Sequence, residues 1–208
     1  MNPLSFILEN KIVAIIRGIA PNKVPAIAEA LCKGGIKLME VTLNSPGALN
    51  VIEQLSKDMR DKMLIGAGTV LTTKDAADAI GAGARFLISP IVDRGLIDLT
   101  KQHGVVSIPG AFTPTEIFNA YAAGGDIIKF FPASSNINYL KDVRAPLPHI
   151  PLMPTGGITT DNIQQFQKAG AVAFGIGGAL LNFKEKTGSD YLEQLTARAK
   201  KFVMAVNT

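Results

Sequence analysis

The chain has 208 residues, of which 47% are hydrophobic and 18% charged, and this composition excludes a disordered or collagenous protein. Cys32 is its one cysteine, so a scaffold held by disulfides is excluded. The length indicates a single domain over residues 1–208. The net charge of +4 comes from dispersed lysines and arginines, so no nucleic acid is expected as a partner. No stretch has the pattern of a membrane span or a secretory signal, and we expect no membrane partner and a cytoplasmic location.

Short apolar runs recur along the whole chain, and their starts lie 19 to 26 residues apart, the length of one strand, one helix and two short loops. The runs are nearly continuous in hydrophobicity, as is typical of parallel strands covered on both faces. A short helix is expected before them, at Asn2–Asn10. The expected strands are Ile12–Ile16, Leu38–Val41, Leu64–Ala67, Phe86–Ile88, Val105–Ile108, Ile127–Phe130, Leu152–Met153 and Ala173–Ile176.

Helix boundaries are marked between these strands. Thr113 and Glu116 have the spacing of a capping box, with Pro114 at the first helical position. Glycines that can end a helix precede many strands, as at Gly34–Gly35 and Gly124–Gly125. Eight such units without a linker predict a (β/α)8 TIM barrel with a short N-terminal helix. An open doubly wound sheet is the alternative.

Polar residues stand at the C-terminal ends of several predicted strands, where barrels of this kind build their active sites. The alternation of side chains along a strand places Glu40 on the same face as Leu38, and Lys129 on the same face as Ile127 and Phe131. With one consistent choice of facing, the residues directed into the barrel mouth are Arg17, Glu40, Thr42, Thr69, Ser89, Pro90, Lys129 and Thr155.

Lys129 lies in the apolar segment 126–133, which is a poor setting for a charged ammonium. Burial lowers the pKa of a lysine, and a neutral amine can attack a ketone to form a Schiff base. Glu40 lies in the similar run 38–43 and can act as a general acid and base. The structural alternatives are a lysine whose amine reaches water, or an ion pair between Lys129 and Glu40. The two residues together favour Schiff-base carbon–carbon chemistry.

Two pairs of glycines follow the last two predicted strands, Gly156 with Gly157 and Gly177 with Gly178. Barrels commonly bind phosphate at these two loops, through backbone N–H groups and the N-terminus of a short helix. A phosphorylated substrate is therefore expected. The pattern Gly175-x-Gly177 does not complete a dinucleotide-binding fingerprint, which needs a third glycine and a following βαβ unit.

Neither a metal nor an organic cofactor is expected. His103 and His149 stand near a helix end and in a proline-rich loop, and no Ser-His-Asp set is suggested. Cys32 lies in a predicted helix, where a small core residue is a simpler interpretation than a metal ligand.

Six segments resemble the 2-keto-3-deoxy-6-phosphogluconate (KDPG) aldolase family, in order along essentially the whole chain. They are Met39–Leu43, Gly66–Val70, Ile88–Pro90, Ile108–Gly110, Ile128–Ala133 and Pro154–Ile158. The resemblance implies a class I aldolase on a (β/α)8 barrel, usually a homotrimer. Such enzymes cleave 2-dehydro-3-deoxy-6-phospho-sugar acids to pyruvate and glyceraldehyde 3-phosphate. Many members also cleave 4-hydroxy-2-oxoglutarate to pyruvate and glyoxylate.

The resemblance also implies roles for individual residues. Lys129 forms the Schiff base and Glu40 moves protons. The residues implied at the pyruvyl end of the substrate are Arg17, Thr69, Pro90 and Phe131, with the first two near its carboxylate. Thr155 is implied to contact the substrate. The groups implied around the phosphate are Gly156, Gly157, Gly177, Gly178 and Ala179.

Two positions depart from the pattern of phosphogluconate-type members. Asn44 stands where those members usually carry arginine, in a pattern similar to the phosphogalactonate branch, and we expect it to contact the distal part of the substrate. Ala179 stands where many members have serine. Because the motifs are mixed, activity on both sugar acids is expected. The alternatives are a phosphosugar epimerase and a non-catalytic phosphosugar-binding barrel, neither of which needs a Schiff-base lysine.

Overall fold

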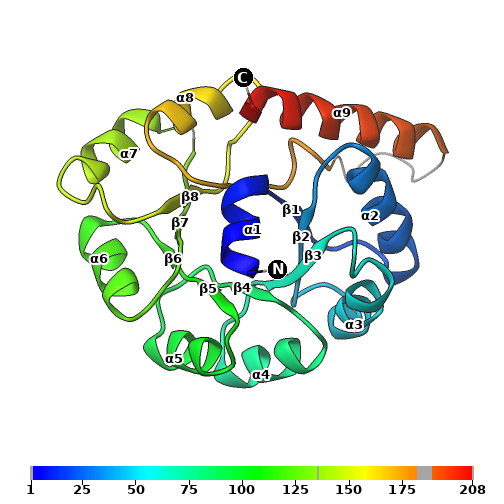
Figure 1. Cartoon of the computed structure of the whole chain (residues 1–208), viewed down its shortest axis with the longest axis horizontal. Helices are drawn as coiled ribbons and strands as arrows, with labels where there is room; N and C mark the ends of the chain where they lie inside the picture. The colour runs from blue at the N-terminus through cyan, green and yellow to red at the C-terminus, as the bar shows by residue number, and fades with distance from the viewer. Residues whose placement is uncertain (1, 135, 182–188, 208) are drawn as a thin grey trace.

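The computed structural model describes residues 2–134, 136–181 and 189–207 and contains parallel strands inside a ring of helices (Figure 1). The strands are β1 (Ile12–Ile16), β2 (Leu38–Thr42), β3 (Leu64–Gly68), β4 (Phe86–Ile88), β5 (Val106–Ile108), β6 (Gly110–Ala111), β7 (Ile128–Phe130), β8 (Leu152–Pro154) and β9 (Phe174–Ile176). The helices are α1 (Pro3–Asn10), η1 (Pro21–Lys23), α2 (Val24–Lys33), α3 (Ala48–Asp58), α4 (Thr73–Gly81), α5 (Arg94–Gln102), α6 (Pro114–Ala122), α7 (Ile137–Arg144), α8 (Ile163–Lys168) and α9 (Ser189–Asn207).

The strands pair in sequence order around a curled sheet. One sheet has the order β5-β4-β3-β2-β1-β9 and a second has the order β6-β7-β8. Isolated bridges join Leu152 to Ala171 and Thr155 to Gly175, next to β8 and β9. A doubly wound sheet reverses its strand order and carries helices on both faces. The sequential order and the outer ring of helices α2–α9 exclude that alternative (Figure 1).

The predicted strands agree with the structure to within one residue at each end, but the sequence did not reveal β6. Pro109 separates β5 from β6 within a single extended segment, and a proline interrupts a ladder because it has no N–H. Its carbonyl still accepts a hydrogen bond from Lys129 N at 2.9 Å. Gly110 is needed next to it, because a Cβ there would lie 2.7 Å from Ser89 O. Because Gly110 has no side chain, the end of β4 can lie directly against β6.

Capping side chains begin several helices. Thr113 and Glu116 form the predicted capping box at α6, with Pro114 in its first turn. Thr72 forms a second box with Asp75 at α4. These contacts satisfy backbone N–H groups that a helix cannot pair internally.

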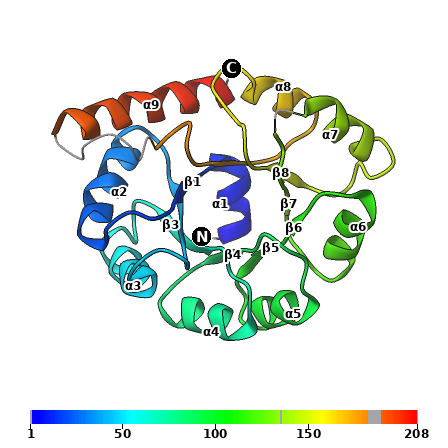
Figure 2. The same cartoon turned by 180° about the vertical axis from the view of Figure 1, so that it is seen from behind.

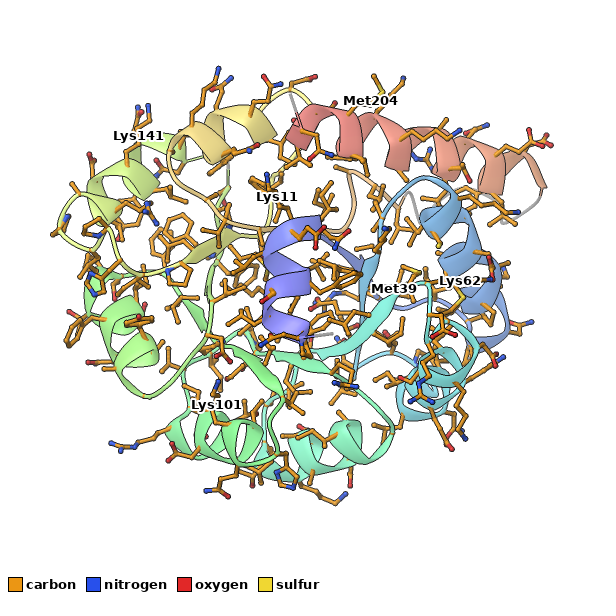
Figure 3. The ribbon with its side chains drawn as sticks, in the orientation of Figure 1. Lys11, Met39, Lys62, Lys101, Lys141 and Met204 are labelled. Atoms are coloured by element: carbon orange, nitrogen blue, oxygen red, sulfur yellow. The ribbon has the colours of Figure 1, made fainter. Side chains whose placement is uncertain are left out.

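Two apolar cores lie on the two faces of the sheet. The outer core fills the space between the strands and the helices, and Met39 of β2 lies in it, whereas Lys141 of α7 lies outside the ring (Figure 3). The inner core is smaller and contains side chains of the opposite strand face, namely Val13, Leu38, Phe86, Ile88, Val106, Ile108, Ile127, Met153 and Ala173. Gly66 makes room for this packing, because a Cβ there would lie 2.4 Å from the Phe86 ring.

Helix α1 lies inside the ring of strands (Figure 1, Figure 2). Asn2 caps it by accepting hydrogen bonds from two backbone N–H groups. Ile7 is fully buried in the inner core, and Leu4 and Phe6 pack against the same cluster. Because α1 leads directly into β1, it covers the end of the sheet at which the strands begin.

None of the helices in the described ranges is both long and apolar enough to cross a bilayer.

Removing the anchor of α1 should destabilise the whole fold. Ile7→Ala leaves a cavity in the inner core, and we expect it to lower the free energy of unfolding by about 2–5 kcal/mol, measured by denaturant titration. Leu8→Ala is the matched control, because Leu8 is 38% exposed on the same helix. Equal stability of the two variants would contradict the assignment of Ile7 as the anchor.

Candidate active site

Lys129 lies in the middle of β7 and points to the inner face of the sheet. Its neighbours Ile128 and Phe130 belong to the outer core, whereas Ile127 belongs to the inner one, as strand alternation predicts. Only 5% of Lys129 is exposed, and its Nζ lies 4.6 Å from the centroid of the Phe131 ring. The amine is therefore covered by an aromatic ring at the end of its own strand.

The surroundings of Lys129 favour the neutral amine. Burial lowers the pKa of Lys129 below its usual value, and the positive charge of Arg17 lowers this pKa further. The negative charge of Glu40 acts in the opposite direction but does not cancel the effect of burial. A lysine with a lowered pKa supplies the free electron pair that a carbonyl addition needs.

Glu40 lies at the centre of β2, in register with Ile15 of β1 and Gly66 of β3. Only 1% of it is exposed, and Oε2 is buried without a hydrogen-bond partner. Burial raises the pKa of Glu40, although Lys129 and Arg17 lower it in part. A carboxyl with a raised pKa can both donate and accept a proton near neutral pH.

Gly68 of β3 makes the space that Glu40 occupies. A Cβ at Gly68 would lie 2.6 Å from Cδ and 2.7 Å from Oε1 of Glu40. No direct ion pair joins Glu40 to Lys129 within the described ranges. The structural ion pair that the sequence left open is therefore not formed, and the two groups influence each other only through their charges.

A second polar cluster surrounds Arg17, just after β1. Its Nη1 donates to Oδ1 of Asn44 at 3.3 Å, and its Nη2 donates to Oγ1 of Thr69 at 3.2 Å. Thr69 follows β3 with a φ of 56°, a left-handed conformation that is rare for a β-branched residue. Backbone strain of this kind amounts to about 1–3 kcal/mol and concentrates at functional sites.

The two double-glycine loops lie side by side at the ends of β8 and β9. Thr155 forms a bridge to Gly175, where a Cβ would lie 2.4 Å from the Thr155 hydroxyl. Gly156 and Gly157 have φ values of 93° and 74°, which glycine adopts without strain. After β9 the chain turns, with Leu180 N and Leu181 N both bonded to Gly177 O. Up to Leu181, where the described segment ends, the expected helix N-terminus at this loop is thus a turn.

Most of the predicted site residues line one cavity of about 630 Å³. The predicted residues on its wall are Arg17, Thr69, Pro90, Lys129, Phe131, Thr155, Gly156, Gly157, Gly177, Gly178 and Ala179. Glu40 and Asn44 are not on the wall. Asn44 bonds to Arg17, which is, and Glu40 acts on Lys129 and Arg17 through its charge. Sequence reasoning missed Ile15, Ile158, Thr159 and Gly175. The phase of Ile15 with Arg17 on β1 is the signal that could have found the first of these.

The sequence predicts that Thr42 faces the barrel mouth, but Thr42 does not line the cavity. It is fully buried and its hydroxyl donates to Ile16 O at 3.2 Å. The described residues contain no group of three or more His, Cys, Asp or Glu side chains that could hold a metal ion. His103 lies at the end of α5, beside Leu99 O, and Cys32 is half-buried in α2.

A model of the family described as KDPG and KHG aldolase matches residues 5–196, which is nearly the whole chain. The chain belongs to this aldolase family. The family contains relatives whose names specify different sugar acids. The probable 2-dehydro-3-deoxy-6-phosphogalactonate aldolase of Rhizobium meliloti is 37% identical over 83% of this chain and 82% of its own length. The 2-dehydro-3-deoxy-phosphogluconate aldolase of Pseudoalteromonas atlantica is 38% identical over 67% of this chain and 66% of its own.

A solved member of the family holds a covalent intermediate. The KDPG aldolase of Legionella pneumophila, with pyruvate captured as a covalent carbinolamine, superposes on this aldolase with a TM-score of 0.81. The two sequences are 28% identical, over 99% of this chain and 97% of that one. A carbinolamine is the adduct that a neutral amine forms with a ketone, which is the chemistry that a buried lysine permits.

The absence of a side chain at Gly68 should be necessary for the Glu40 carboxyl to hold its catalytic position. In Gly68→Ala the new methyl group must displace the Glu40 carboxyl, and because only a side-chain end moves, we expect the fold to persist. Misplacement of a catalytic group by about 1 Å can reduce turnover by about 10²-fold, measured here as pyruvate release.

Gly81→Ala is the matched control for this variant. A Cβ at Gly81, at the end of α4, meets nothing within 4 Å. Turnover in Gly68→Ala that equals turnover in Gly81→Ala would show that the carboxyl does not depend on this space.

Proposed function

We propose that this aldolase is a class I enzyme that cleaves 2-dehydro-3-deoxy-6-phospho-sugar acids into pyruvate and glyceraldehyde 3-phosphate. Membership of the family makes the chain a carbon–carbon lyase. The observation that carries the proposal is the Lys129 amine on the cavity wall. It is buried and covered by Phe131, and burial lowers its pKa although the charge of Glu40 raises this pKa in part.

The proposed reaction begins when neutral Lys129 Nζ attacks the C2 ketone and forms a carbinolamine. The hydroxyl of the carbinolamine takes up a proton from solvent and leaves as water, which gives a protonated imine that withdraws electrons from C3. Glu40 accepts the proton of the C4 hydroxyl, the C3–C4 bond breaks, and the aldehyde leaves. The electron pair of that bond now forms an enamine, and Glu40 returns a proton to C3. Hydrolysis of the protonated imine releases pyruvate, and loss of the extra proton to solvent restores the neutral amine.

The residues that line the cavity support the proposed binding of the substrate. Arg17 and Thr69 stand beside Lys129, where they can bind the carboxylate next to the reacting ketone. The backbone at Gly156, Gly157, Gly177, Gly178 and Ala179 lines the same cavity together with Thr155 and can offer N–H groups to a phosphate. Relatives named for either sugar acid support activity on both epimers, and 4-hydroxy-2-oxoglutarate is a further candidate substrate.

Three finer proposals accompany the function. We propose that the two sheets and the bridges beside β9 form one closed eight-stranded barrel, with β5 and β6 as two parts of the fifth strand. The sequential pairing of the strands supports this closure. The resemblance to the family supports a homotrimer and a cytoplasmic location, and size-exclusion chromatography with light scattering tests the trimer.

Reduction of the imine should identify Lys129 directly. Incubation with pyruvate and borohydride should add one reduced pyruvyl group, which peptide mapping should place between Ala120 and Pro132. Lys129→Ala should abolish both the labelling and the cleavage of the sugar acids, because the chain offers no second buried amine on the cavity wall within the described ranges.

Lys101→Ala is the matched control, since Lys101 is an exposed lysine of α5 that pairs with Asp126 and does not line the cavity. An unlabelled but fully active chain would exclude class I chemistry. Chelator-sensitive activity without labelling would favour a phosphosugar epimerase, and tight binding without pyruvate release would favour a non-catalytic barrel.

Glu40→Gln should separate proton transfer from imine formation. Without a proton carrier, turnover should fall by about 10²–10⁴-fold. Because the charge of Glu40 raises the pKa of Lys129, removing it should lower that pKa, and pyruvate labelling should then persist to lower pH than in the wild type. The measurements are steady-state pyruvate release and the pH dependence of borohydride labelling. Normal turnover in this variant would reduce Glu40 to a neighbour of Lys129.

A further inference from the structure

The turn after β2 holds the backbone on both sides of Arg17. The Thr42 hydroxyl donates to Ile16 O at 3.2 Å, and Gly18 N donates to the Ser45 hydroxyl at 2.8 Å. The two hydroxyls lie 2.9 Å apart and bond to each other. Both are buried, so these contacts are protected from competition with water. The backbone of Arg17 is thus fixed by residues of the same turn that carries Asn44.

The side chain of Arg17 is held at two further points. Asn44 Oδ1 and Thr69 Oγ1 each accept one N–H of the guanidinium, at 3.3 and 3.2 Å. An arginine has five N–H donors in a planar fork, so three remain for another acceptor. Arg17 and Lys129 are the two cations on the cavity wall as described, and Asn44 is not on that wall. The geometry connects Asn44 to the cavity through Arg17.

The strained backbone of Thr69 belongs to the same arrangement. Its φ of 56° turns the chain after β3 and presents the hydroxyl to the guanidinium. A left-handed threonine persists only where the surrounding contacts hold it there. Two neighbouring strands, β2 and β3, therefore end in residues that hold one arginine from the third strand, β1.

We propose that Asn44 is a positioning residue for the pyruvyl end of the substrate, which fixes Arg17 so that its free N–H groups receive the carboxylate. This inference rests on the proposed function. It differs from the expectation that Asn44 contacts the distal part of the substrate and selects the epimer. The hydrogen bond to Arg17 and the absence of Asn44 from the described cavity wall favour the positioning role.

The physical reason is preorganisation. A free arginine side chain has many rotamers, and binding a carboxylate then includes the loss of that freedom. A guanidinium already held at two N–H groups loses less on binding. Removing the side chain that accepts one of these hydrogen bonds should weaken carboxylate binding by about tenfold in affinity, because a hydrogen bond to a charged group is lost.

Pyruvate is the probe that separates the two roles, since it has the carboxylate and the ketone but no distal end. The measurement is the concentration of pyruvate that half-saturates borohydride labelling of Lys129, together with the limiting labelling rate. The proteins are the wild type, Asn44→Leu, Arg17→Met and the double variant. Asn119→Leu, an exposed asparagine on α6, is the matched control, and thermal melting checks that each variant is folded.

Asn44→Leu should raise the half-saturating pyruvate concentration by about tenfold while the limiting rate changes less. The double variant should match Arg17→Met, because Asn44 has nothing to position once the guanidinium is gone. In the cleavage assay, Asn44→Leu should raise KM for both epimers and leave the ratio of their kcat/KM values unchanged. Asn44→Ala repeats the test with a smaller side chain in case leucine disturbs the turn.

Four results would overturn the inference. An unchanged half-saturating pyruvate concentration in folded Asn44→Leu and Asn44→Ala would overturn this inference and leave the proposed function intact. An additive loss in the double variant would do the same. A changed epimer ratio with normal pyruvate labelling would assign Asn44 to the distal end instead. A wild-type chain that pyruvate does not label would overturn the proposed function first and this inference with it.

Discussion

The site depends on keeping one amine and one carboxyl out of water without letting them form an ion pair. Either group alone is destabilised by burial, because a charged form loses hydration that the apolar wall does not replace. Lys129 responds with a lowered pKa and Glu40 with a raised pKa. A direct ion pair would restore both ordinary charges and remove the nucleophile. The structure places the two groups on β7 and β2, and no ion pair joins them within the described residues.

Several features distant from one another in the sequence surround the buried side chains of Lys129 and Glu40. Gly68 leaves a recess for the Glu40 carboxyl, and Phe131 covers the Lys129 amine. Arg17 adds a positive charge that disfavours protonation of Lys129 and favours ionisation of Glu40. The inner core below contributes apolar walls and no competing hydrogen-bond partners. The fold therefore supplies the low dielectric, and the charge of Arg17 and the mutual attraction of Lys129 and Glu40 modify the two pKa values.

The sequence predicted the strands and the direction of Lys129 well, because both follow from local patterns. A period of two along β7 is enough to place Lys129 and Ile127 on one face. Other features depend on residues that are distant in the chain. Gly68 reads as an ordinary strand glycine until the Glu40 carboxyl is seen beside it. The contacts of Arg17 join residues 27 and 52 positions apart, so no local pattern reveals that Asn44 lies beside it. Pro109 hid β6 because a proline ordinarily ends a strand.

Helix α1 has a consequence for the order of events during turnover. With Ile7 fixed in the inner core, the ring is filled at the end where the strands begin, and the cavity opens at the other end. Lys129 lies within β7, whereas the glycine loops follow the C-terminal ends of β8 and β9. In the proposed reaction the three-carbon acid remains bound to Lys129 while the aldehyde occupies the path outward. The fragments must therefore leave in a fixed sequence, aldehyde first and pyruvate second, and in the synthetic direction pyruvate must enter before its partner.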